Sequence, residues 1–283
     1  MKSFQEISMN EPTGMIFDVQ RNSFVDGPGV RTAVFFKGCN LRCAWCHNPE
    51  SQSQNAEILF DQSKCTSCGR CAEAFESDPA FECPSHAKKR CGKRVTVDEV
   101  LAECVKDQRF FDTSGGGVTF SGGECMLQID FLEALLKRCK QKGLNTAIDT
   151  AGNLPYDRFE RILGYTDLFL YDVKCADPDL HKRYTGVDNR LILENLRRLL
   201  ASGAQVWVRI PIIPTVNDTV EEMQRIRSIF TDGPTPEKIE LLPYHSMGEG
   251  KYGALGRTAY RFDSPSRETV ERLRQVFLRE NRV

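Results

Sequence analysis

Short runs of β-branched and aliphatic residues alternate along the chain with longer segments whose apolar positions recur every three or four residues. The runs predict strands and the longer segments predict helices, which is the order of repeated strand–helix units around a parallel sheet. Six strands are expected, at Thr32–Phe36, Gly117–Ser121, Asn145–Asp149, Leu168–Lys174, Gln205–Ile213 and Lys238–Tyr244. Helices are expected at Thr96–Lys106, Leu127–Lys142, Tyr156–Leu163, Leu191–Ala201, Val220–Phe230 and Pro265–Arg279.

A segment between the first and second predicted strands interrupts this alternation. It is rich in Cys, Ser, Glu and Lys and shows no strand–helix alternation of its own. We therefore expect an α/β fold, a partial (β/α)6 TIM-like barrel formed by residues 1–46 and 95–283, with a small Cys-rich insert at residues 47–94. In barrels of this kind the reactive groups gather where the strands end.

Composition narrows the functional classes. The chain has 283 residues, of which 40% are hydrophobic, so it can bury a substantial core. Its formal net charge of −1 suggests neither nucleic acid nor an anionic membrane as an electrostatic partner. Residues 1–14 lack the apolar core of a signal peptide, and no later segment has the length to span a bilayer, so a cytoplasmic protein is expected. In a reducing compartment, twelve cysteines are better explained by metal than by disulfides.

Three of these cysteines lie close together directly after the first predicted strand. Cys39, Cys43 and Cys46 have C-x3-C-x2-C spacing, one thiol short of a closed four-ligand site. The spacing alone fits disulfides in a secreted protein, zinc with a distant fourth ligand such as His47, or an iron–sulfur cube with one iron left open. An open iron would offer a place for a reactant.

Unusual residues follow the later strands, and we expect all of them to face the cysteine loop. They are Ser121-Gly122-Gly123-Glu124, Asp149-Thr150-Ala151-Gly152, Asp172-Val173-Lys174, Arg209-Ile210-Pro211 and Pro243-Tyr244-His245. The glycine pair could be only a tight turn, but with Glu124 it offers close backbone approach and a carboxylate, which together suit an ammonium group. Asp172 and Lys174 point to the same side of a strand, as a structural ion pair or as ligand contacts. His245 alone could be an ordinary buried histidine.

Together these segments resemble the radical S-adenosylmethionine enzymes, and specifically the activating enzymes of glycyl radical enzymes, of the pyruvate formate-lyase activating type. The resemblance covers nearly the whole chain. It rests on Val25-Asp26-Gly27-Pro28-Gly29-Val30-Arg31-Thr32, Phe35-Phe36-Lys37-Gly38-Cys39, Cys46-His47-Asn48-Pro49-Glu50, Val118 to Glu124, Asp149-Thr150, Asp172 to Lys174, Val208 to Pro211 and Leu241 to His245.

The resemblance implies a role for each motif. Cys39, Cys43 and Cys46 would hold a [4Fe-4S] cluster whose open iron binds S-adenosylmethionine. The ammonium end of that cosubstrate would be received by Gly122, Gly123 and Glu124. Trp45 would contact the adenine. The rest of the cofactor pocket would be formed by Cys46, His47, Asp149, Asp172, Val173, Lys174, Arg209 and His245. In some relatives the two aspartates also hold a monovalent cation.

The same resemblance implies an oxidoreductase in which the cofactors carry the chemistry, so no side-chain acid or base is expected. Reductive cleavage of S-adenosylmethionine would give a 5'-deoxyadenosyl radical, which would remove a hydrogen atom from a backbone glycine of a partner glycyl radical enzyme. A flavodoxin or ferredoxin-type protein would supply the electron. Two alternatives stay open: a radical enzyme acting directly on a small molecule, and a non-catalytic iron–sulfur or zinc module.

The insert carries a second set of thiols. Cys65, Cys68 and Cys71 begin a bacterial ferredoxin motif, in which a Cys-Pro is expected four residues after the third thiol, but Phe75 stands there. A Cys-Pro occurs later, at Cys83, and Cys91 follows. Related activators often carry two auxiliary clusters, which would need eight thiols, whereas this segment holds five. We therefore predict a shortened ferredoxin-like module with one auxiliary [4Fe-4S] cluster on Cys65, Cys68, Cys71 and Cys83. Cys91 is the rival fourth ligand, and zinc is the rival metal.

Overall fold

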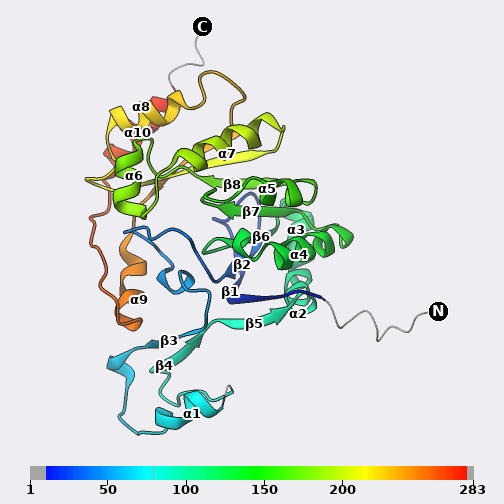
Figure 1. Ribbon diagram of the computed structural model, residues 1–283, viewed down its shortest axis with the longest axis vertical. Helices are drawn as coiled ribbons and strands as arrows, with labels where there is room; N and C mark the ends of the chain where they lie inside the picture. Colours follow the sequence, from blue (N-terminus) through cyan, green and yellow to red (C-terminus); the bar gives the residue numbers. More distant parts are fainter. Residues whose placement is uncertain (1–10, 79, 279–283) are drawn as a thin grey trace, which may run out of the picture.

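The computed structural model describes residues 11–78 and 80–278, so residues 1–10 and the expected helix end at Arg279 lie outside the described part. Its main feature is an eight-stranded sheet with the strand order β10-β9-β8-β7-β6-β2-β1-β5 (Figure 1). The strands are β1 Thr13–Ser23, β2 Arg31–Phe36, β5 Lys93–Thr96, β6 Gly117–Gly122, β7 Thr146–Thr150, β8 Leu168–Asp172, β9 Val206–Ile212 and β10 Lys238–Pro243.

Six neighbouring strands of this sheet, β2 and β6 to β10, pair in parallel. Each begins or ends within two residues of a strand predicted from the sequence, so the mostly parallel α/β fold is confirmed. Strand β2 is buried along its whole length, and β6 is buried up to its last residue. Burial on both faces explains why these strands appear in the sequence as continuous apolar runs.

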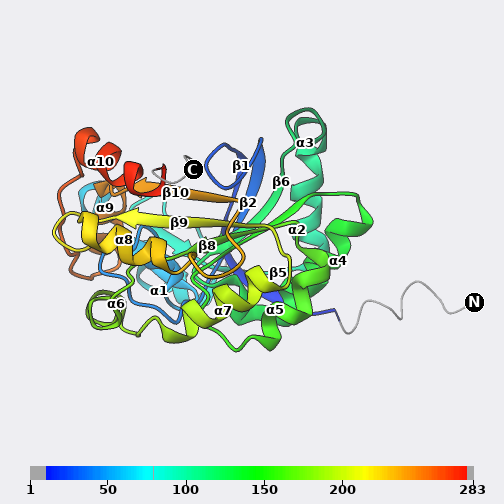
Figure 2. The same ribbon diagram turned by 90° about the horizontal axis from the view of Figure 1, so that it is seen from above.

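Helices lie between the strands of the main sheet and after its last strand, β10. They are α2 Val97–Cys104, α3 Gln108–Ser114, α4 Ile129–Gln141, α5 Asp157–Ile162, α6 Pro178–Thr185, α7 Arg190–Ala201, α8 Val220–Ser228, α9 Glu249–Ala254 and α10 Arg267–Leu278. Helix α4 shows how they form, because Phe131, Leu132, Leu135 and Leu136 give it one buried stripe. From above, α5, α7 and α8 are seen along one side of the strands (Figure 2). No helix in the described part of the chain is long and apolar enough to cross a membrane.

Strand β1 corrects the prediction that the first strand is Thr32–Phe36. It precedes that strand and pairs antiparallel with both β2 and β5. Only Gly14 and Ile16 of its eleven residues are buried, so no apolar run marks it in the sequence. The fully buried Arg31 side chain joins the loop between β1 and β2 to β6: its guanidinium donates to the Pro28 carbonyl in the loop and to the Val118 carbonyl and Thr119 hydroxyl on β6.

The insert also has more regular structure than expected. Strands β3 (Glu57–Phe60) and β4 (Lys88–Cys91) form a separate antiparallel pair, and helix α1 (Cys71–Ser77) lies between them in the sequence. The sequence showed no strand–helix alternation in this segment, but the structure has two short strands with a helix between them. These strands have four residues each, too few for periodicity to reveal. Figure 1 shows this small unit at the end of the molecule beyond β5.

Candidate active site

The carboxyl ends of the parallel strands and the cysteine loop after β2 enclose one cavity of about 240 Å³. The strand ends therefore meet the cysteine loop, as predicted. The lining residues are Cys39, Leu41, Cys43, Trp45, Cys46, His47, Asn48, Ser51, Ser121, Gly122, Gly123, Asp149, Thr150, Ala151, Asp172, Lys174, Arg209, Pro211 and Leu242.

The cysteine loop leaves β2 through Gly38, whose φ of +99° is in the left-handed region that favours glycine. The loop is held from two sides. Gly38 N donates to the Ser51 carbonyl at 2.6 Å, and the Gly38 carbonyl accepts from Glu124 N at 2.7 Å. Cys39 therefore starts from a backbone position fixed between the loop's own return segment and the turn after β6.

The glycine pair after β6 lets this contact form. A Cβ atom at Gly122, whose φ is +110°, would lie 2.3 Å from the backbone nitrogen of Phe36. A Cβ atom at Gly123 would lie 2.2 Å from the carbonyl oxygen of Gly38. Both distances are shorter than real side chains tolerate, so the pair serves close backbone approach rather than only a tight turn.

The three thiols of the loop lie in a poorly hydrated environment. Burial raises the pKa of Cys39 to about 11 and that of Cys43 to about 12, and it also raises the pKa of Cys46. The Lys174 ammonium acts in the opposite direction on all three thiols. The thiols and this lysine therefore face the same space. The positive charge of Lys174 stabilises the thiolate form of each cysteine.

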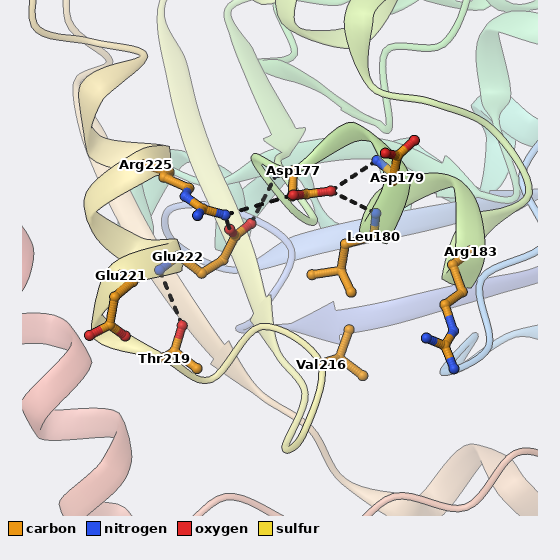
Figure 3. Close-up of a pocket in the computed structure, with 9 residues that line it drawn as sticks. All are labelled: Asp177, Asp179, Leu180, Arg183, Val216, Thr219, Glu221, Glu222 and Arg225. Carbon is orange, nitrogen blue, oxygen red and sulfur yellow. Dashed lines mark hydrogen bonds and ion pairs between the residues drawn. The ribbon is translucent and has the colours of Figure 1, made fainter.

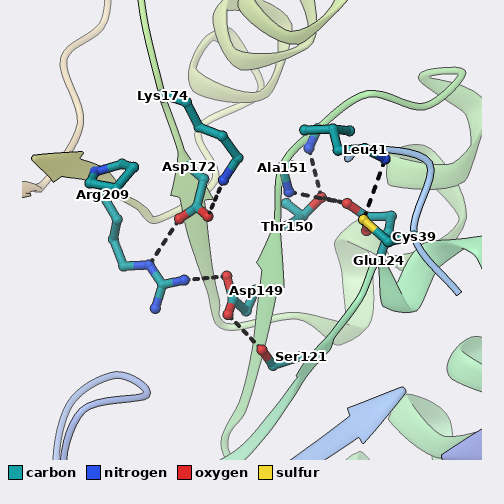
Figure 4. Close-up of polar contacts among 12 residues, drawn as sticks. Cys39, Leu41, Ser121, Glu124, Asp149, Thr150, Ala151, Asp172, Lys174 and Arg209 are labelled. Atoms are coloured by element: carbon teal, nitrogen blue, oxygen red, sulfur yellow. Dashed lines mark hydrogen bonds and ion pairs between the residues drawn. The ribbon is translucent and has the colours of Figure 1, made fainter. Parts of the chain in front are cut away.

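Opposite the cysteines, four charged side chains form a chain of ion pairs across three strands (Figure 4). Arg209 on β9 pairs through Nη2 with Asp149 on β7, and its Nε donates to Asp172 at 3.2 Å. Asp172, at the end of β8, also accepts from Lys174 Nζ at 2.8 Å. The Ser121 hydroxyl donates to Asp149 at 2.6 Å. The cavity thus has both signs of charge on one wall.

The two aspartates of this chain differ in acidity. Burial raises the pKa of the Asp149 carboxyl, and the charge of Asp172 adds to this, while Arg209 only partly opposes it. At Asp172 burial acts in the same sense, but Lys174 and Arg209 together outweigh it and lower its pKa. Asp172 is the carboxylate that contacts both cations, whereas Asp149 contacts Arg209 alone of the two.

Glu124 lies beneath the cavity rather than on its wall. Its side chain has no exposed surface. One carboxylate oxygen accepts from the Thr150 hydroxyl at 2.8 Å and from Ala151 N at 3.1 Å. The other accepts from Met126 N at 3.4 Å. Burial raises the pKa of Glu124 to about 7 against these hydrogen bonds. This carboxylate therefore joins the ends of β6 and β7, and Glu124 is not among the residues that line the cavity.

Two other predicted pocket residues lie off the cavity wall. Val173 packs into the hydrophobic core, because it alternates with its two charged neighbours. His245 lies on the exposed rim, where its ring meets the ring of His47 with centroids 4.6 Å apart. Trp45 lines the cavity and also packs against Tyr184 and Phe262.

The segment after β8, which carries Lys174, is held from the outside. The Glu222 carboxylate at the start of α8 accepts from the backbone nitrogens of Ala176 and Asp177. Asp177 in turn caps α6 by accepting from two backbone nitrogens. A second cavity, of about 420 Å³, lies between these helix starts (Figure 3). It shares no lining residue with the cavity at the strand ends.

Only some of the cysteines that were predicted to bind a cluster in the insert lie close together. Cys65 and Cys68 are exposed, while Cys71 and Cys83 both belong to a small apolar cluster around Phe75. Cys91 is buried elsewhere, at the end of β4. Over residues 11–78 and 80–278, no three His, Cys, Asp or Glu side chains are placed to hold a single metal ion.

Ser121 and Thr150 were named from the sequence among the strand-end residues but were given no role, although each fixes a carboxylate of the site. The parallel register pairs Phe120 with Ile148, so Ser121 and Asp149 are the next positions along neighbouring strands. Matching strand ends by register would have placed these two side chains together.

Comparison with known proteins agrees with the family resemblance seen in the sequence motifs. The sequence model of the Radical SAM superfamily matches residues 33–226. A trans-4-hydroxy-L-proline dehydratase activating enzyme of Clostridioides difficile is 35% identical, with 94% of this chain and 97% of that protein covered. A choline trimethylamine-lyase activating enzyme of Oleidesulfovibrio alaskensis is 40% identical, with 88% and 89% covered. A pyruvate formate-lyase-activating enzyme of Clostridium pasteurianum is 39% identical, with 86% and 87% covered.

Among solved structures, a domain of the pyruvate-formate lyase-activating enzyme of Bacteroides vulgatus superimposes with a TM-score of 0.51 at 33% identity. The match covers 58% of this chain and 94% of that one. The curated relatives are thus similar along almost their whole length, and the solved domain is similar over the part it contains.

Proposed function

The chain belongs to the radical S-adenosylmethionine superfamily and, within it, to the activating enzymes of glycyl radical enzymes; from that premise we propose how its residues divide the work. The protein is an oxidoreductase that installs a glycyl radical on a partner enzyme. The observation that carries the assignment of the site is the single cavity between the three-cysteine loop and the chain of ion pairs.

When bound, a [4Fe-4S] cluster and S-adenosylmethionine together supply the 5'-deoxyadenosyl radical that takes a hydrogen atom from a backbone glycine of the partner. Cys39, Cys43 and Cys46 hold the cluster. The donor set fits, because the three thiols of one loop line the same cavity. Burial of the thiols keeps water away from the reacting groups.

The ion-paired wall receives the charged end of the cosubstrate. S-adenosylmethionine carries a carboxylate and an ammonium, and this wall offers cations and anions on adjacent strands. Lys174 and Arg209 bind the carboxylate, while the backbone carbonyls of Gly122 and Gly123 accept from the ammonium. Asp149 and Asp172 hold the cations in position. Trp45 contacts the adenine beside the cysteine loop.

In this proposal Glu124 has a structural role, whereas the motif suggests that it binds the ammonium group. Its carboxylate fixes the spacing between the glycine turn and the end of β7. It therefore orients the ammonium acceptors without contacting the cosubstrate. His47 and His245 form the rim of the site.

We propose further that the six parallel strands form a partial barrel and that residues 47–94 are a ferredoxin-like insert with one auxiliary [4Fe-4S] cluster. Cys83 is the fourth ligand beside Cys65, Cys68 and Cys71, because it shares an apolar cluster with Cys71. The Arg90 guanidinium lies over the Phe75 ring of that apolar cluster and donates through Nη2 to the Phe75 carbonyl at 2.7 Å, while its buried Nε has no partner among the described residues. A cube with four thiolates is anionic and suits a neighbouring cation.

Two matched variants test the fourth ligand. Cys83→Ser is expected to lose the iron of the auxiliary cluster, and Cys91→Ser is expected to keep it. Iron analysis and electron paramagnetic resonance of the reduced protein report this without any activity measurement. Loss of iron only in the Cys91 variant would assign the ligand to Cys91.

The proposed activity itself is tested with a glycyl radical enzyme as the partner protein. Anaerobic incubation of both proteins with reductant and S-adenosylmethionine is expected to give a glycyl doublet in the electron paramagnetic resonance spectrum. Cofactor cleavage without a doublet would count against protein activation and for a small-molecule substrate.

A further inference from the structure

The segment that follows the cysteine loop folds back against both ends of that loop. A short helical turn, Pro49–Ser51, ends at Gln52. The Gln52 carbonyl accepts from Cys39 N at 3.2 Å. At the other end of the loop, burial raises the pKa of Cys46, and hydrogen bonds to its sulfur from the Asn48 backbone and the Gln52 side chain oppose that rise. One residue outside the thiol motif therefore contacts the first and the last of the three proposed ligands.

The side-chain amide of Gln52 is oriented by a cation from a distant part of the chain. Arg257 Nη1 donates to Gln52 Oε1 at 3.4 Å and to the Pro49 carbonyl at 2.8 Å. A guanidinium can only donate hydrogen bonds, so the amide oxygen faces Arg257 and the amide nitrogen faces the Cys46 sulfur. Positive charge at the amide oxygen also polarises the group, which makes its N–H a stronger donor.

Arg257 is itself anchored to the insert. Its Nη2 pairs with Glu57, the first residue of β3. The second oxygen of that carboxylate accepts from Lys37 Nζ at 3.1 Å. Lys37 has a fully buried side chain and comes directly before the Gly38 turn that starts the cysteine loop. Helix α9, which precedes Arg257, contacts β3 (Figure 1). The insert and the cysteine loop are thus joined through one network of charged groups.

The local backbone does not require a glutamine side chain at this position. Gln52 N donates to the Pro49 carbonyl at 3.2 Å and so closes the helical turn, and the contact with Cys39 N is made by the Gln52 carbonyl. Both contacts are available to any residue with this backbone. The side chain is used instead for the contacts with Arg257 and Cys46.

A donor placed on a cysteine ligand changes the electronic properties of an iron–sulfur cluster. A hydrogen bond to a thiolate stabilises negative charge on the sulfur, so it favours the more negative, reduced state. Hydrogen bonds to the sulfurs are among the factors that set the reduction potential of such clusters. Groups that contact the ligands also fix the orientation of those ligands. A donor to Cys46 therefore makes the cluster easier to reduce.

We propose that Gln52 is a positioning residue that raises the reduction potential of the cluster on the three-cysteine loop. It does so through a hydrogen bond to the Cys46 thiolate, and Arg257 and Glu57 hold the amide in place. The inference rests on the proposed function, since it needs a cluster on Cys39, Cys43 and Cys46. It gives the insert a second role beside carrying the proposed auxiliary cluster, because Glu57 belongs to the insert.

The test compares reduction potentials in the full chain loaded with its clusters. Gln52→Met keeps the length of the side chain, removes its donor and leaves the backbone contact with Cys39. Arg257→Lys keeps the charge but loses the forked contacts. The control is Gln141→Met, at an exposed position of α4. Anaerobic redox titration is followed by electron paramagnetic resonance, and the signal of the first cluster is identified by its absence from Cys43→Ala.

Gln52→Met is expected to lower the equilibrium constant for one-electron reduction about tenfold, which is a fall of about 59 mV in the potential. Arg257→Lys should lower the potential by a smaller amount. It should add nothing in a chain that already carries Gln52→Met, because the arginine acts through the glutamine. Gln141→Met should keep the potential of the parent protein.

Three results would overturn the proposal. The first is an unchanged potential in Gln52→Met. The second is loss of the first cluster from that variant, which would make the glutamine a purely structural residue. The third is an equal shift caused by Arg257→Lys with and without Gln52→Met, which would mean that the arginine acts independently. Failure of the proposed function is a separate outcome, because the parent protein itself would then lack the signal that depends on Cys43, or would give no glycyl doublet in its partner.

Discussion

Replacing Thr150 by valine removes one hydrogen bond from the buried Glu124 carboxylate and leaves the shape of the side chain nearly unchanged. The Thr150 hydroxyl donates to that carboxylate at 2.8 Å, and neither residue has more than 2% of its surface exposed. The remaining donors are the backbone nitrogens of Ala151 and Met126. The same hydroxyl accepts from Gly152 N at 2.9 Å. That second loss does not depend on the charge of Glu124, so the contact between Thr150 and Glu124 is measured by the difference between two pH values.

The size of the effect depends on whether Glu124 is charged. A hydrogen bond to a charged group contributes about 1.5–3 kcal/mol, against about 1 kcal/mol between neutral groups. The pKa of Glu124 is raised from 4.5 to about 7. We therefore expect Thr150→Val to lower the free energy of unfolding by about 2 kcal/mol at pH 8, and by about 1 kcal/mol or less at pH 5.5.

The sign of the pH dependence follows from the same pKa. Between pH 4.5 and about 7 the folded protein keeps a proton on Glu124 that the unfolded chain has lost. Stability contributed by this group therefore falls as the pH rises through that window. Losing the Thr150 donor raises the folded pKa further, so the fall becomes larger in the variant.

The assay is urea unfolding of the anaerobic protein at the two pH values, followed by circular dichroism. Thr113→Val is the control, because Thr113 is exposed on α3 and its hydroxyl contacts only carbonyls of its own helix. Two results would refute the assignment of Glu124 as a buried, ionisable group that joins β6 to β7. One is an equal decrease in the free energy of unfolding at both pH values, and the other is a decrease below about 0.5 kcal/mol at pH 8.

Three further variants test the walls of the cavity. Gly123→Ala places a Cβ atom 2.2 Å from the Gly38 carbonyl oxygen, so it should reduce iron at the first site, measured by electron paramagnetic resonance; normal iron content would contradict this. Arg209→Lys keeps the charge but loses the two-pronged contact with the aspartates, and should raise the KM for S-adenosylmethionine about tenfold at unchanged iron content; an unchanged KM would exclude the arginine from binding. Asp172→Asn should lower the free energy of unfolding by about 2 kcal/mol at pH 7, because it leaves two buried cations without the carboxylate that they share. Because the pKa of Asp172 is lowered in the fold, this cost should shrink as the pH falls below about 3.9, and a constant cost would argue against the ion pairs.

Local sequence patterns predicted the parts of the fold that are buried on both sides. The six parallel strands and most of the long helices have continuous or periodic apolar positions. Their observed bounds agree with the predicted bounds to within about two residues at most ends. Strand β1 was missed because most of its side chains alternate between partly and fully exposed. Strands β3 and β4 were missed because their stability depends on pairing across about thirty residues of intervening chain.

The candidate site shows the same division. The cysteine spacing and the charged strand ends, both local motifs, identified most of the cavity wall. The direction of Glu124 could not be predicted, because it is set by a hydroxyl 26 positions away. The pairing of Arg209 with Asp149 spans 60 positions. Such contacts follow from strand order and register, which one sequence alone does not state.

The central claim is that this chain takes a hydrogen atom from a backbone glycine of another protein. The most direct measurement is isotope transfer, with the partner glycyl radical enzyme labelled with deuterium at the α-carbon of its glycines. Our account predicts that deuterium appears in 5'-deoxyadenosine during activation and that an unlabelled partner gives none. Efficient formation of unlabelled 5'-deoxyadenosine with the labelled partner, and labelled product only from a deuterated small molecule, would contradict it.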